Sequence, residues 1–467
     1  MKYVSTRGSA PVLGFKDVLL SGLARDGGLY IPEAWPTLSS QTISAMAGQP
    51  YAEVAKVVLY PFVEGEVEKP AFDDMVDQAY ASFHHPAVAP MLQLDGNHWL
   101  LELFHGPTLA FKDVAMQLLA RLMDHVLAER GQKATIVGAT SGDTGSAAIE
   151  AFKGRENTDI FILFPNGKVS PVQQRQMTTI TDANVHCLAI EGDFDACQAI
   201  VKDMFNNLDF RDRLQLSGVN SINWARIMAQ IVYYFTSAAS IGAPGRTVSF
   251  TVPTGNFGDI FAAYVAKRMG LPIDKLVIAT NRNDILSRTL ATSRYEKAET
   301  APTISPSMDI QVSSNFERLL FDAGDRDAEV VRNQMDSLKQ SGSFSINEAT
   351  MKNILAEFSA GACDEDATAA QIKATLESCG YLADPHTAVG IHVAEKCMNE
   401  NIPMITLATA HPAKFPAAVE AASGVYPDLP PRMGDMMTRE ERFEILANDV
   451  SVVEAFIEKH SRAATHS

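Results

Sequence analysis

The sequence predicts an α/β protein in which helices cover parallel β-sheets. Strand patterns expected at 134–138, 159–164, 186–191, 247–252 and 276–280 alternate with amphipathic helices, which is the rhythm of a parallel, helix-covered sheet. Polar, glycine-containing loops follow several of these strands and lead directly into helices. At 467 residues the chain is also longer than one hydrophobic core usually supports, so we expect two or three domains.

The remaining segments surround this α/β region. Helical spacing in 51–62 and 72–83 indicates a mostly helical N-terminal unit, and Asp95-Gly96-Asn97 marks the turn of a hairpin over 87–103. The βα rhythm fails between about 292 and 379, which we interpret as an inserted helical lobe, and a last short strand is expected at 404–407. The predicted divisions are an N-terminal unit (1–95), a smaller α/β domain (113–218), and a large domain formed by 96–112 and 219–467 that carries the lobe.

Charge and composition exclude several classes of partner. The net charge of −17 disfavours nucleic acid and anionic membranes, since both require a basic surface. The five cysteines are odd in number and scattered, as expected for thiols in a reducing cytosol. The N-terminus lacks an apolar signal segment, and no apolar run is long enough to span a bilayer. We therefore expect a cytoplasmic protein that acts on a small molecule.

The stretch 247–269 predicts an anion site. A buried strand is followed by a tight loop and a helix, and Gly255 and Gly258 allow successive N–H groups to turn towards one phosphate at the helix start. The loop GNFG lacks both the P-loop ending and the dinucleotide spacing, so the phosphate belongs to another kind of ligand. The alternative is an ordinary βα turn, in which Gly and Asn are common for conformational reasons.

Lys112 lies directly before the predicted start of a helix that ends at Gly131. Its apolar neighbours shield the amine from water, which favours the neutral form needed to make a Schiff base. Taken alone, an exposed first-turn lysine is the alternative, because lysines are seldom fully buried.

A second loop, Thr140 to Gly145, brings three hydroxyl groups and two glycines to a helix start, which suits a carboxylate. Its alternative is a capping turn. Arg226 in the first turn of another helix is unusual, because the helix dipole disfavours cations there. Either an anionic ligand or a nearby carboxylate explains it. Lys168 and Arg175 are candidate surface charges, and His386 has no partner at metal-ligand spacing, so no metal site is predicted.

Seven motifs in this order make the chain resemble a known family: FHGPTLAFKD, TSGDTG, NSINWAR, PTGNFGD, SPSMDI, DPHTAVG and ATAHPAKF. Together with RGSAP and DGGLYIP near the N-terminus, the chain is similar to threonine synthases of the long bacterial and fungal type. The resemblance covers nearly the whole chain. It implies a fold type II pyridoxal-phosphate enzyme, with the tryptophan synthase β-like arrangement of a large and a small domain.

The resemblance also implies an activity. A carbon–oxygen lyase of this family converts O-phospho-L-homoserine and water to L-threonine and phosphate by γ-elimination and then β-hydration. The expected partners are the small-molecule substrate and pyridoxal 5'-phosphate, with no nucleic acid or membrane, in a monomer or homodimer.

Residue roles follow from the same resemblance. Lys112 is the expected catalytic residue and binds the cofactor covalently. The other expected cofactor contacts are Asp143, Gly255, Asn256, Phe257, Gly258, Asp259 and Thr409. The expected substrate contacts are Thr140, Ser141 and Thr144 for the α-carboxylate, and Ser221, Asn223 and Arg226 with Lys168 for the phosphate. Asp143 departs from the Asn that fold type II relatives usually carry, and a carboxylate beside a phenolate-like oxygen should repel it unless a proton is shared.

Two other functions compete with this interpretation. A related pyridoxal-phosphate lyase, either a phospholyase or a serine or threonine dehydratase, would release 2-oxobutanoate in place of threonine. A catalytically inactive relative that senses a phosphorylated ligand would lack a working Lys112. The phosphate-binding cluster disfavours a dehydratase, and the intact Lys112 disfavours the sensor.

Overall fold

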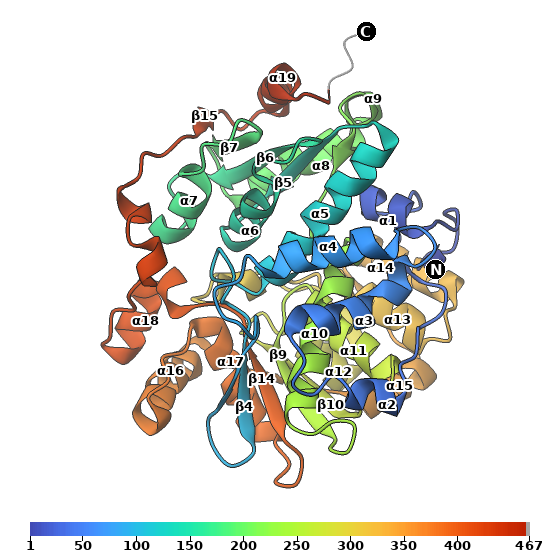
Figure 1. Ribbon diagram of the computed structural model, residues 1–467, viewed down its shortest axis with the longest axis vertical. Helices are drawn as coiled ribbons and strands as arrows, with labels where there is room; N and C mark the ends of the chain where they lie inside the picture. Colours follow the sequence, from blue (N-terminus) through green and yellow to red (C-terminus); the bar gives the residue numbers. More distant parts are fainter. Residues whose placement is uncertain (464–467) are drawn as a thin grey trace.

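A computed structural model describes residues 1–463 and contains two large β-sheets, one above the other in Figure 1. The lower sheet has six strands in the order β13-β10-β9-β14-β4-β3. All neighbours in it are parallel except the hairpin pair β3 and β4. Its strands are β3 (Met91–Gln93), β4 (His98–Glu102), β9 (Val248–Pro253), β10 (Ile273–Thr280), β13 (Phe358–Ala362) and β14 (Met404–Ala408).

The upper sheet has five parallel strands in the order β15-β7-β6-β5-β8. Its strands are β5 (Ala134–Ala139), β6 (Thr158–Pro165), β7 (Val185–Ile190), β8 (Leu216–Ser217) and β15 (Glu444–Leu446). The helices of this half are α5 (Lys112–Arg130), α6 (Asp143–Phe152), α7 (Pro171–Thr178), α8 (Phe194–Asn206) and α9 (Leu208–Arg213). The predicted class, parallel sheets covered by helices in a fold type II arrangement, is confirmed.

Helices cover both faces of the six-stranded sheet (Figure 1). They include α10 (Trp224–Ser240), α11 (Gly258–Arg268), α12 (Ile285–Thr292) and α17 (Pro385–Cys397). Strand β9 is buried at every position, as expected for a strand with helices on both sides. Because parallel strands end at one edge, the loops after β9 and β14 lie at the same edge of the sheet.

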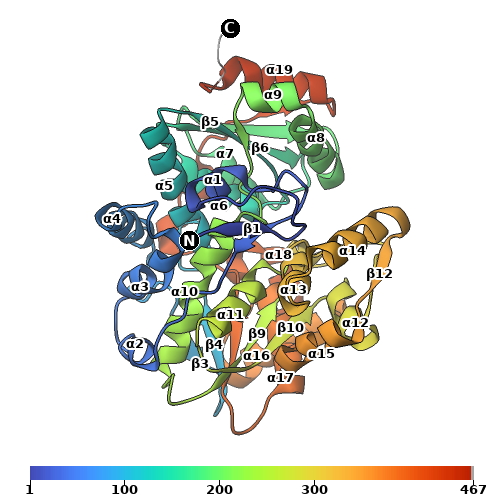
Figure 2. The same cartoon turned by 90° about the vertical axis from the view of Figure 1, so that its right-hand side faces the viewer.

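The N-terminal unit packs against α10 and α5 (Figure 2). It consists of α1 (Phe15–Ser21), α2 (Ser40–Ser44), α3 (Tyr51–Val63) and α4 (Lys69–Tyr80), with the short antiparallel pair β1 (Tyr3–Ser5) and β2 (Tyr30–Pro32). The Tyr3 hydroxyl donates to the carbonyl of Phe62 at 2.7 Å, which fastens β1 to α3.

The segment expected to be an inserted lobe contains more strand than the sequence indicated. It holds α13 (Phe316–Ala323), α14 (Ala328–Ser341), α15 (Glu348–Glu357) and α16 (Glu365–Cys379), and the hairpin of β11 (Arg294–Glu296) and β12 (Ser343–Ser345). Its strand β13 extends the six-stranded sheet as a parallel neighbour of β10. The loop from 303 to 315 contacts the GNFG turn, because Ser313 and Asn315 donate hydrogen bonds to its backbone carbonyls.

The C-terminal segment crosses from one sheet to the other. After α18 (Pro416–Ser423) the chain reaches β15, which pairs with β7, and α19 (Val450–His460), which packs on α8. We expected this segment to belong to the large domain, whereas β15 pairs with β7 of the five-stranded sheet. The exposed pattern of β15 explains why its pairing was not foreseen. The domain boundaries themselves stay a prediction.

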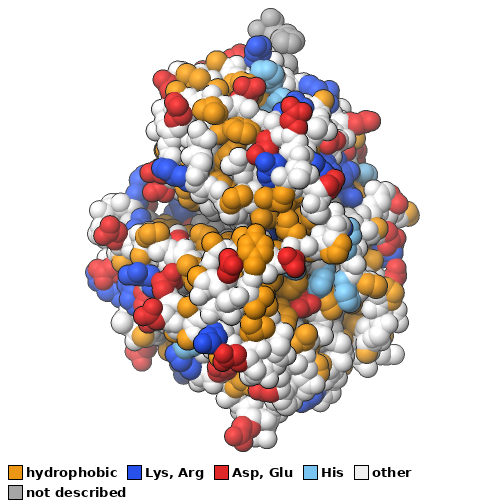
Figure 3. All heavy atoms as spheres, turned by 90° about the vertical axis from the view of Figure 1, so that its left-hand side faces the viewer, with side chains coloured by type: hydrophobic (Ala, Val, Ile, Leu, Met, Phe, Trp, Pro, Cys, Tyr) orange, Lys and Arg blue, Asp and Glu red, His pale blue; other side chains and the backbone are white. Residues whose placement is uncertain are grey.

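The surface carries charges of both signs. On the face seen in Figure 3, acidic and basic side chains are interspersed among apolar ones. In the described part of the chain, no helix is both long enough and apolar enough to cross a membrane.

We predict that α19 stabilises the five-stranded half. Ile457 is fully buried in a cluster with Leu188 and Phe161, so Ile457→Ala should lower the free energy of unfolding by about 2–5 kcal/mol. Val452 on the same helix is 40% exposed, and Val452→Ala should change the free energy by less than about 0.5 kcal/mol. Urea unfolding followed by circular dichroism measures both, and equal effects would contradict the packing described.

Candidate active site

Lys112 is the first residue of α5. Its side chain is almost completely buried, and Nζ lies 3.4 Å from Asp143 Oδ2 and 4.9 Å from the centre of the Phe111 ring. The Phe111 N–H donates to the carbonyl of Thr409 at 2.9 Å, which ties the start of α5 to the end of β14. The sequence placed Lys112 one residue outside the helix, and the structure places it in the first turn.

The amine of Lys112 is held in an environment that disfavours its proton. Burial lowers the pKa of Lys112, the carboxylate of Asp143 opposes that effect, and the positive charges of Arg226 and Lys414 lower the pKa further. The net shift is downward, which makes the neutral, nucleophilic amine more accessible. The alternative of an exposed first-turn lysine is therefore excluded.

The GNFG loop is shaped for an anion. A Cβ at Gly255 would lie 2.7 Å from the Ser307 carbonyl oxygen, so only glycine fits there, and Phe257 adopts a left-handed φ of 63°. Within residues 1–463, the N–H groups of Gly255, Asn256, Phe257 and Gly258 meet no hydrogen-bond acceptor. Four free N–H groups at the start of α11 form a site for a phosphate.

A neighbouring loop holds this turn in place. Ser313 Oγ donates to the Gly255 carbonyl at 2.6 Å, and the backbone and side-chain N–H groups of Asn315 donate to the Asn256 carbonyl at 3.1 and 2.9 Å. Arg318 is fully buried and donates to Asn315 Oδ1. It also donates to the backbone carbonyls of Tyr30 and Ile222, and its guanidinium lies 5.8 Å from the centre of the Trp224 ring. These residues were missed in the sequence because they lie more than 50 positions beyond the loop they support.

Asp259 has a different setting from the rest of the loop. Its Oδ1 accepts hydrogen bonds from the hydroxyl groups of Tyr233 and Tyr234, while Oδ2 has no partner among the described residues. Burial raises the pKa of Asp259 to about 6 although the two tyrosines oppose the shift. The side chain thus fastens α11 to α10, and its backbone sits in the first turn beside the cradle.

The TSGDTG loop opens α6. Thr140 Oγ1 accepts from the N–H groups of Gly142 and Gly145, both at 2.9 Å, which fixes the loop and leaves the hydroxyl hydrogen free to donate. Ser141 and Thr144 are half-buried. Hydroxyl donors beside a helix N-terminus suit a carboxylate.

Arg226 is buried without a carboxylate partner. Its Nη1 donates to the Val219 carbonyl at 3.1 Å, and its Nε has no partner among the described residues. Burial lowers the pKa of Arg226 to about 10. The sequence left two explanations open. Within residues 1–463 Arg226 forms no salt bridge, and a buried guanidinium without a carboxylate partner favours an anionic ligand.

The other predicted phosphate ligands differ in their surroundings. Asn223 is fully buried, its Oδ1 caps α10 by accepting from the Ala225 N–H, and its Nδ2 donates to the Leu19 carbonyl. That side chain caps the helix, and one of its two Nδ2 hydrogens has no acceptor among residues 1–463. Ser221 is half-buried, and Lys168 is exposed in the loop after β6. Arg175 pairs with Glu441 at 3.3 Å as a surface charge.

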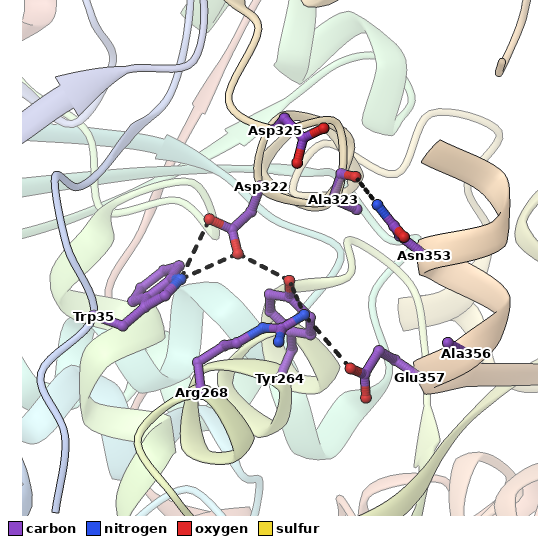
Figure 4. A pocket seen from close by; sticks show the side chains of 9 residues that line it. All are labelled: Trp35, Tyr264, Arg268, Asp322, Ala323, Asp325, Asn353, Ala356 and Glu357. Atoms are coloured by element: carbon purple, nitrogen blue, oxygen red, sulfur yellow. Dashed lines mark hydrogen bonds and ion pairs between the residues drawn. The ribbon is translucent and has the colours of Figure 1, made fainter. Parts of the chain in front are cut away.

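A cavity of about 500 Å³ lies elsewhere, where the N-terminal unit meets α11, α13 and α15. Figure 4 shows that Asp322, Arg268 and Glu357 are bonded to other residues that line the cavity, whereas no dashed line reaches Asp325. Asp322 accepts from Trp35 Nε1 at 3.1 Å and from the Tyr264 hydroxyl at 2.8 Å, and Arg268 lies 3.5 Å from Glu357. We interpret this cavity as part of the packing interface between the N-terminal unit and these helices, distinct from the site around Lys112.

Comparison with known proteins gives three matching family descriptions. "Threonine synthase N terminus" matches residues 2–80, "Pyridoxal-phosphate dependent enzyme" matches 84–336, and "Threonine synthase, C-terminal" matches 387–457. The chain is 53% identical to the threonine synthase of Pseudomonas aeruginosa, with 98% of each chain covered. It is 40% identical to that of Saccharomyces cerevisiae, covering 98% of this chain and 97% of the relative.

Solved structures agree. The crystal structure of a pyridoxal-phosphate-bound threonine synthase from Brucella melitensis is 64% identical and superposes with a TM-score of 0.97, covering 99% of this chain and all of that one. The yeast threonine synthase structure is 38% identical, with a TM-score of 0.93 and 98% of each chain covered.

We predict that Asp259 makes stability depend on pH. Its pKa of about 6 in the folded protein lies above the usual value of 3.8, so the folded state binds more protons and loses stability as pH rises between these values. Asp259→Asn keeps the Oδ1 acceptor and removes the charge. The variant should therefore gain up to about 3 kcal/mol relative to the wild type between pH 4 and 7.

Chemical unfolding at several pH values measures this difference. Stability curves of wild type and variant that run parallel across the whole range would contradict a raised pKa at Asp259.

Proposed function

The chain belongs to the threonine synthase family, and from that premise we propose which of its residues carry out the reaction. Its activity is the pyridoxal-phosphate-dependent conversion of O-phospho-L-homoserine and water to L-threonine and phosphate, the last step of threonine biosynthesis. The reaction is a γ-elimination followed by a β-hydration, which classes the enzyme as a carbon–oxygen lyase.

The residues present fit the cofactor. The four free N–H groups of the GNFG loop, where a Cβ at Gly255 has no room, would hold its phosphate, and Lys112 Nζ would bind its aldehyde carbon. The hydroxyl of Thr409, buried at the end of β14, would hydrogen-bond the ring nitrogen. When bound, pyridoxal phosphate supplies an electron sink for negative charge that develops on the substrate carbon chain.

Lys112 then moves protons on the substrate. As a neutral amine it takes a proton from Cα and then one from Cβ, and as an ammonium it returns protons to Cγ and finally to Cα. The lowered pKa of Lys112 makes its neutral form easier to reach, so that one group can act in both directions. Its burial also keeps bulk water from exchanging with the transferred proton.

The substrate is held at its two charged ends. We propose that Ser141, Thr144 and the Thr140 hydroxyl donate to the α-carboxylate at the start of α6. Arg226, with Ser221 and with Lys168 from the exposed loop, binds the phosphate and stabilises its growing charge as the bond to Cγ breaks. Asn223 joins this set through its second Nδ2 hydrogen, because the first donates to the Leu19 carbonyl and Oδ1 caps α10.

The assignment of roles is carried by two buried basic side chains, Lys112 and Arg226. Lys112 has a lowered pKa and Arg226 has no carboxylate partner within residues 1–463. A dehydratase has no substrate phosphate that would require Arg226, and a ligand sensor does not require an activated lysine.

We further propose that the enzyme works in the cytoplasm as a monomer or homodimer, without nucleic acid.

Product analysis tests the proposal first. With O-phospho-L-homoserine and cofactor, the protein should release phosphate and L-threonine in equal amounts, because both come from one turnover. Lys112→Ala should lower turnover by at least about 1,000-fold while circular dichroism shows an unchanged fold. Release of 2-oxobutanoate in place of threonine would identify a phospholyase, and normal turnover by the variant would refute the role of Lys112.

Arg226→Ala should weaken binding of the phosphorylated substrate by about 2–5 kcal/mol, because a desolvated charge pair is lost. The Michaelis constant measures this, and cofactor affinity should change little. Lys168→Ala serves as the comparison, and we expect less than about 1 kcal/mol because Lys168 is exposed. A normal Michaelis constant for Arg226→Ala would exclude its role.

A further inference from the structure

Three of the sequence motifs contain residues with no role assigned so far, namely Ser307, His386 and Lys414, and these residues gather around Asp143. Ser307 of SPSMDI donates from Oγ to Asp143 Oδ2 at 3.1 Å. His386 of DPHTAVG accepts from the Ser307 N–H at 3.3 Å. Lys414 of ATAHPAKF places Nζ 3.1 Å from Asp143 Oδ1. Residues far apart in the chain thus surround one buried carboxylate.

Lys414 is the most unusual of these residues, because its side chain is completely buried. Nζ donates to the Thr108 carbonyl at 2.7 Å and to Gln176 Oε1 at 2.8 Å, and its third near neighbour is Asp143. All three neighbouring atoms are acceptors, as an ammonium with three hydrogens requires. A buried ammonium is costly unless a carboxylate pairs with it, and Asp143 is that carboxylate.

His386 does not supply the positive charge. Its Nε2 accepts a hydrogen bond from the Ser307 N–H, so the ring hydrogen is on Nδ1, which lies 2.7 Å from Asp384 Oδ2. A ring with this tautomer is neutral. The cations next to Asp143 are therefore Lys414 and Lys112.

We propose that Lys414 is a positioning residue that acts as the fixed counter-ion of Asp143, so that Lys112 is free to stand beside this carboxylate as a neutral amine. The proposal rests on the role of Lys112 proposed above. Lys414 is held by Thr108 and Gln176 and stays in place, whereas Lys112 must lose and regain its proton during turnover.

The charges around the pair support this division. Burial alone would raise the pKa of Asp143, but Lys414, and after it Lys112, outweigh burial and hold that pKa well below its usual range. Burial also lowers the pKa of Lys112, and Lys414 adds to that effect while Asp143 opposes it. The other charged or titratable groups that act on these three side chains are Arg226, Asp259, His386 and Asp113.

Without Lys414, Asp143 would keep only Lys112 as a balancing cation. The two would then form a buried ion pair across the 3.4 Å that separates them, and Lys112 would hold its proton more tightly. Asp143 and Lys414 together act like one neutral group. An uncharged residue at position 143 would need no such counter-ion, and the pairing with Lys414 explains how a carboxylate is tolerated here.

The test measures how readily Lys112 captures the cofactor. Full-length protein freed of cofactor is mixed with pyridoxal phosphate, and the growth of the visible absorption band is timed from about pH 6 to about pH 10, which spans the titration of a perturbed lysine. The variants are Lys414→Met, Asp143→Asn and the double variant Asp143→Asn/Lys414→Met. Thermal unfolding of each variant is recorded in parallel.

We expect Lys414→Met to move the midpoint of the rate profile upward by about one pH unit or more, which is a tenfold slower capture near neutral pH. The double variant should return to within about half a unit of the wild type, because it removes the carboxylate together with its counter-ion. A role of Lys414 in packing alone predicts no such rescue. An unchanged midpoint in Lys414→Met, or a double variant shifted as far as the single one, would overturn the proposal.

Folding failure is also decisive. If Lys414→Met does not fold but the double variant does, the unpaired charge of Asp143 is the cause and the proposal stands. If neither folds while Asp143→Asn does, Lys414 is needed whatever the charge of residue 143, and the proposal is wrong. Cofactor capture is independent of product formation, so these outcomes are separate from the test of the threonine synthase reaction.

Discussion

The structure depends on a balance of charges that are shut away from water. Lys112, Asp143, Arg226 and Lys414 are all at most 8% exposed and lie close enough to shift one another's ionisation. In such surroundings each added charge is felt strongly, because little solvent screens it. With Lys112 as a neutral amine, the two cations Arg226 and Lys414 outnumber the carboxylate of Asp143, so this cluster is short of negative charge. Two anionic groups, the phosphate of the cofactor and that of the substrate, are the complement that this excess favours.

The fold supplies this cluster by bringing loops together from distant parts of the chain. Lys112 begins α5, Asp143 begins α6, the GNFG cradle begins α11, and Thr409 follows β14. Parallel sheets make such convergence possible, since all their strands end at the same edge. The loop from 303 to 315 adds a second layer: it braces the cradle through Ser313 and Asn315 and reaches Asp143 through Ser307. The segment interpreted from sequence as a lobe without assigned chemistry thus shapes the site.

Local patterns predicted the fold better than they predicted the site's surroundings. Strands β9 and β10 and helix α11 could be found because burial and helical spacing are written in neighbouring residues. The edge strand β15 is mostly exposed and pairs with β7 some 250 positions away, so no local pattern marks it.

The same limit applies to the residues of the site. Lys112 and the GNFG loop have local signatures, whereas the burial of Lys414 and the bracing by Arg318 follow from tertiary packing. Asn223 combines both kinds of information, since its place in a polar motif indicates a ligand and its packing also makes it the cap of α10.

The pairing of Asp143 with Lys414 is not explained by stability. Replacing a buried ion pair by uncharged groups of similar size is often neutral or favourable, because desolvating two ions offsets their attraction. An asparagine at position 143 with an uncharged residue at 414 would therefore fold at least as well.

What the ion pair provides is a carboxylate that remains an acceptor while Lys112 changes its protonation state. An amide cannot match this, because only one of its two ends accepts. Ser307 and Gln173 both donate to Asp143, at 3.1 and 2.8 Å. Lys112 Nζ lies 3.4 Å from its Oδ2, and Lys414 Nζ lies 3.1 Å from its Oδ1. All four neighbours are donors, so the position requires a group that accepts on every side, and an ionised carboxylate with its own counter-ion meets that requirement.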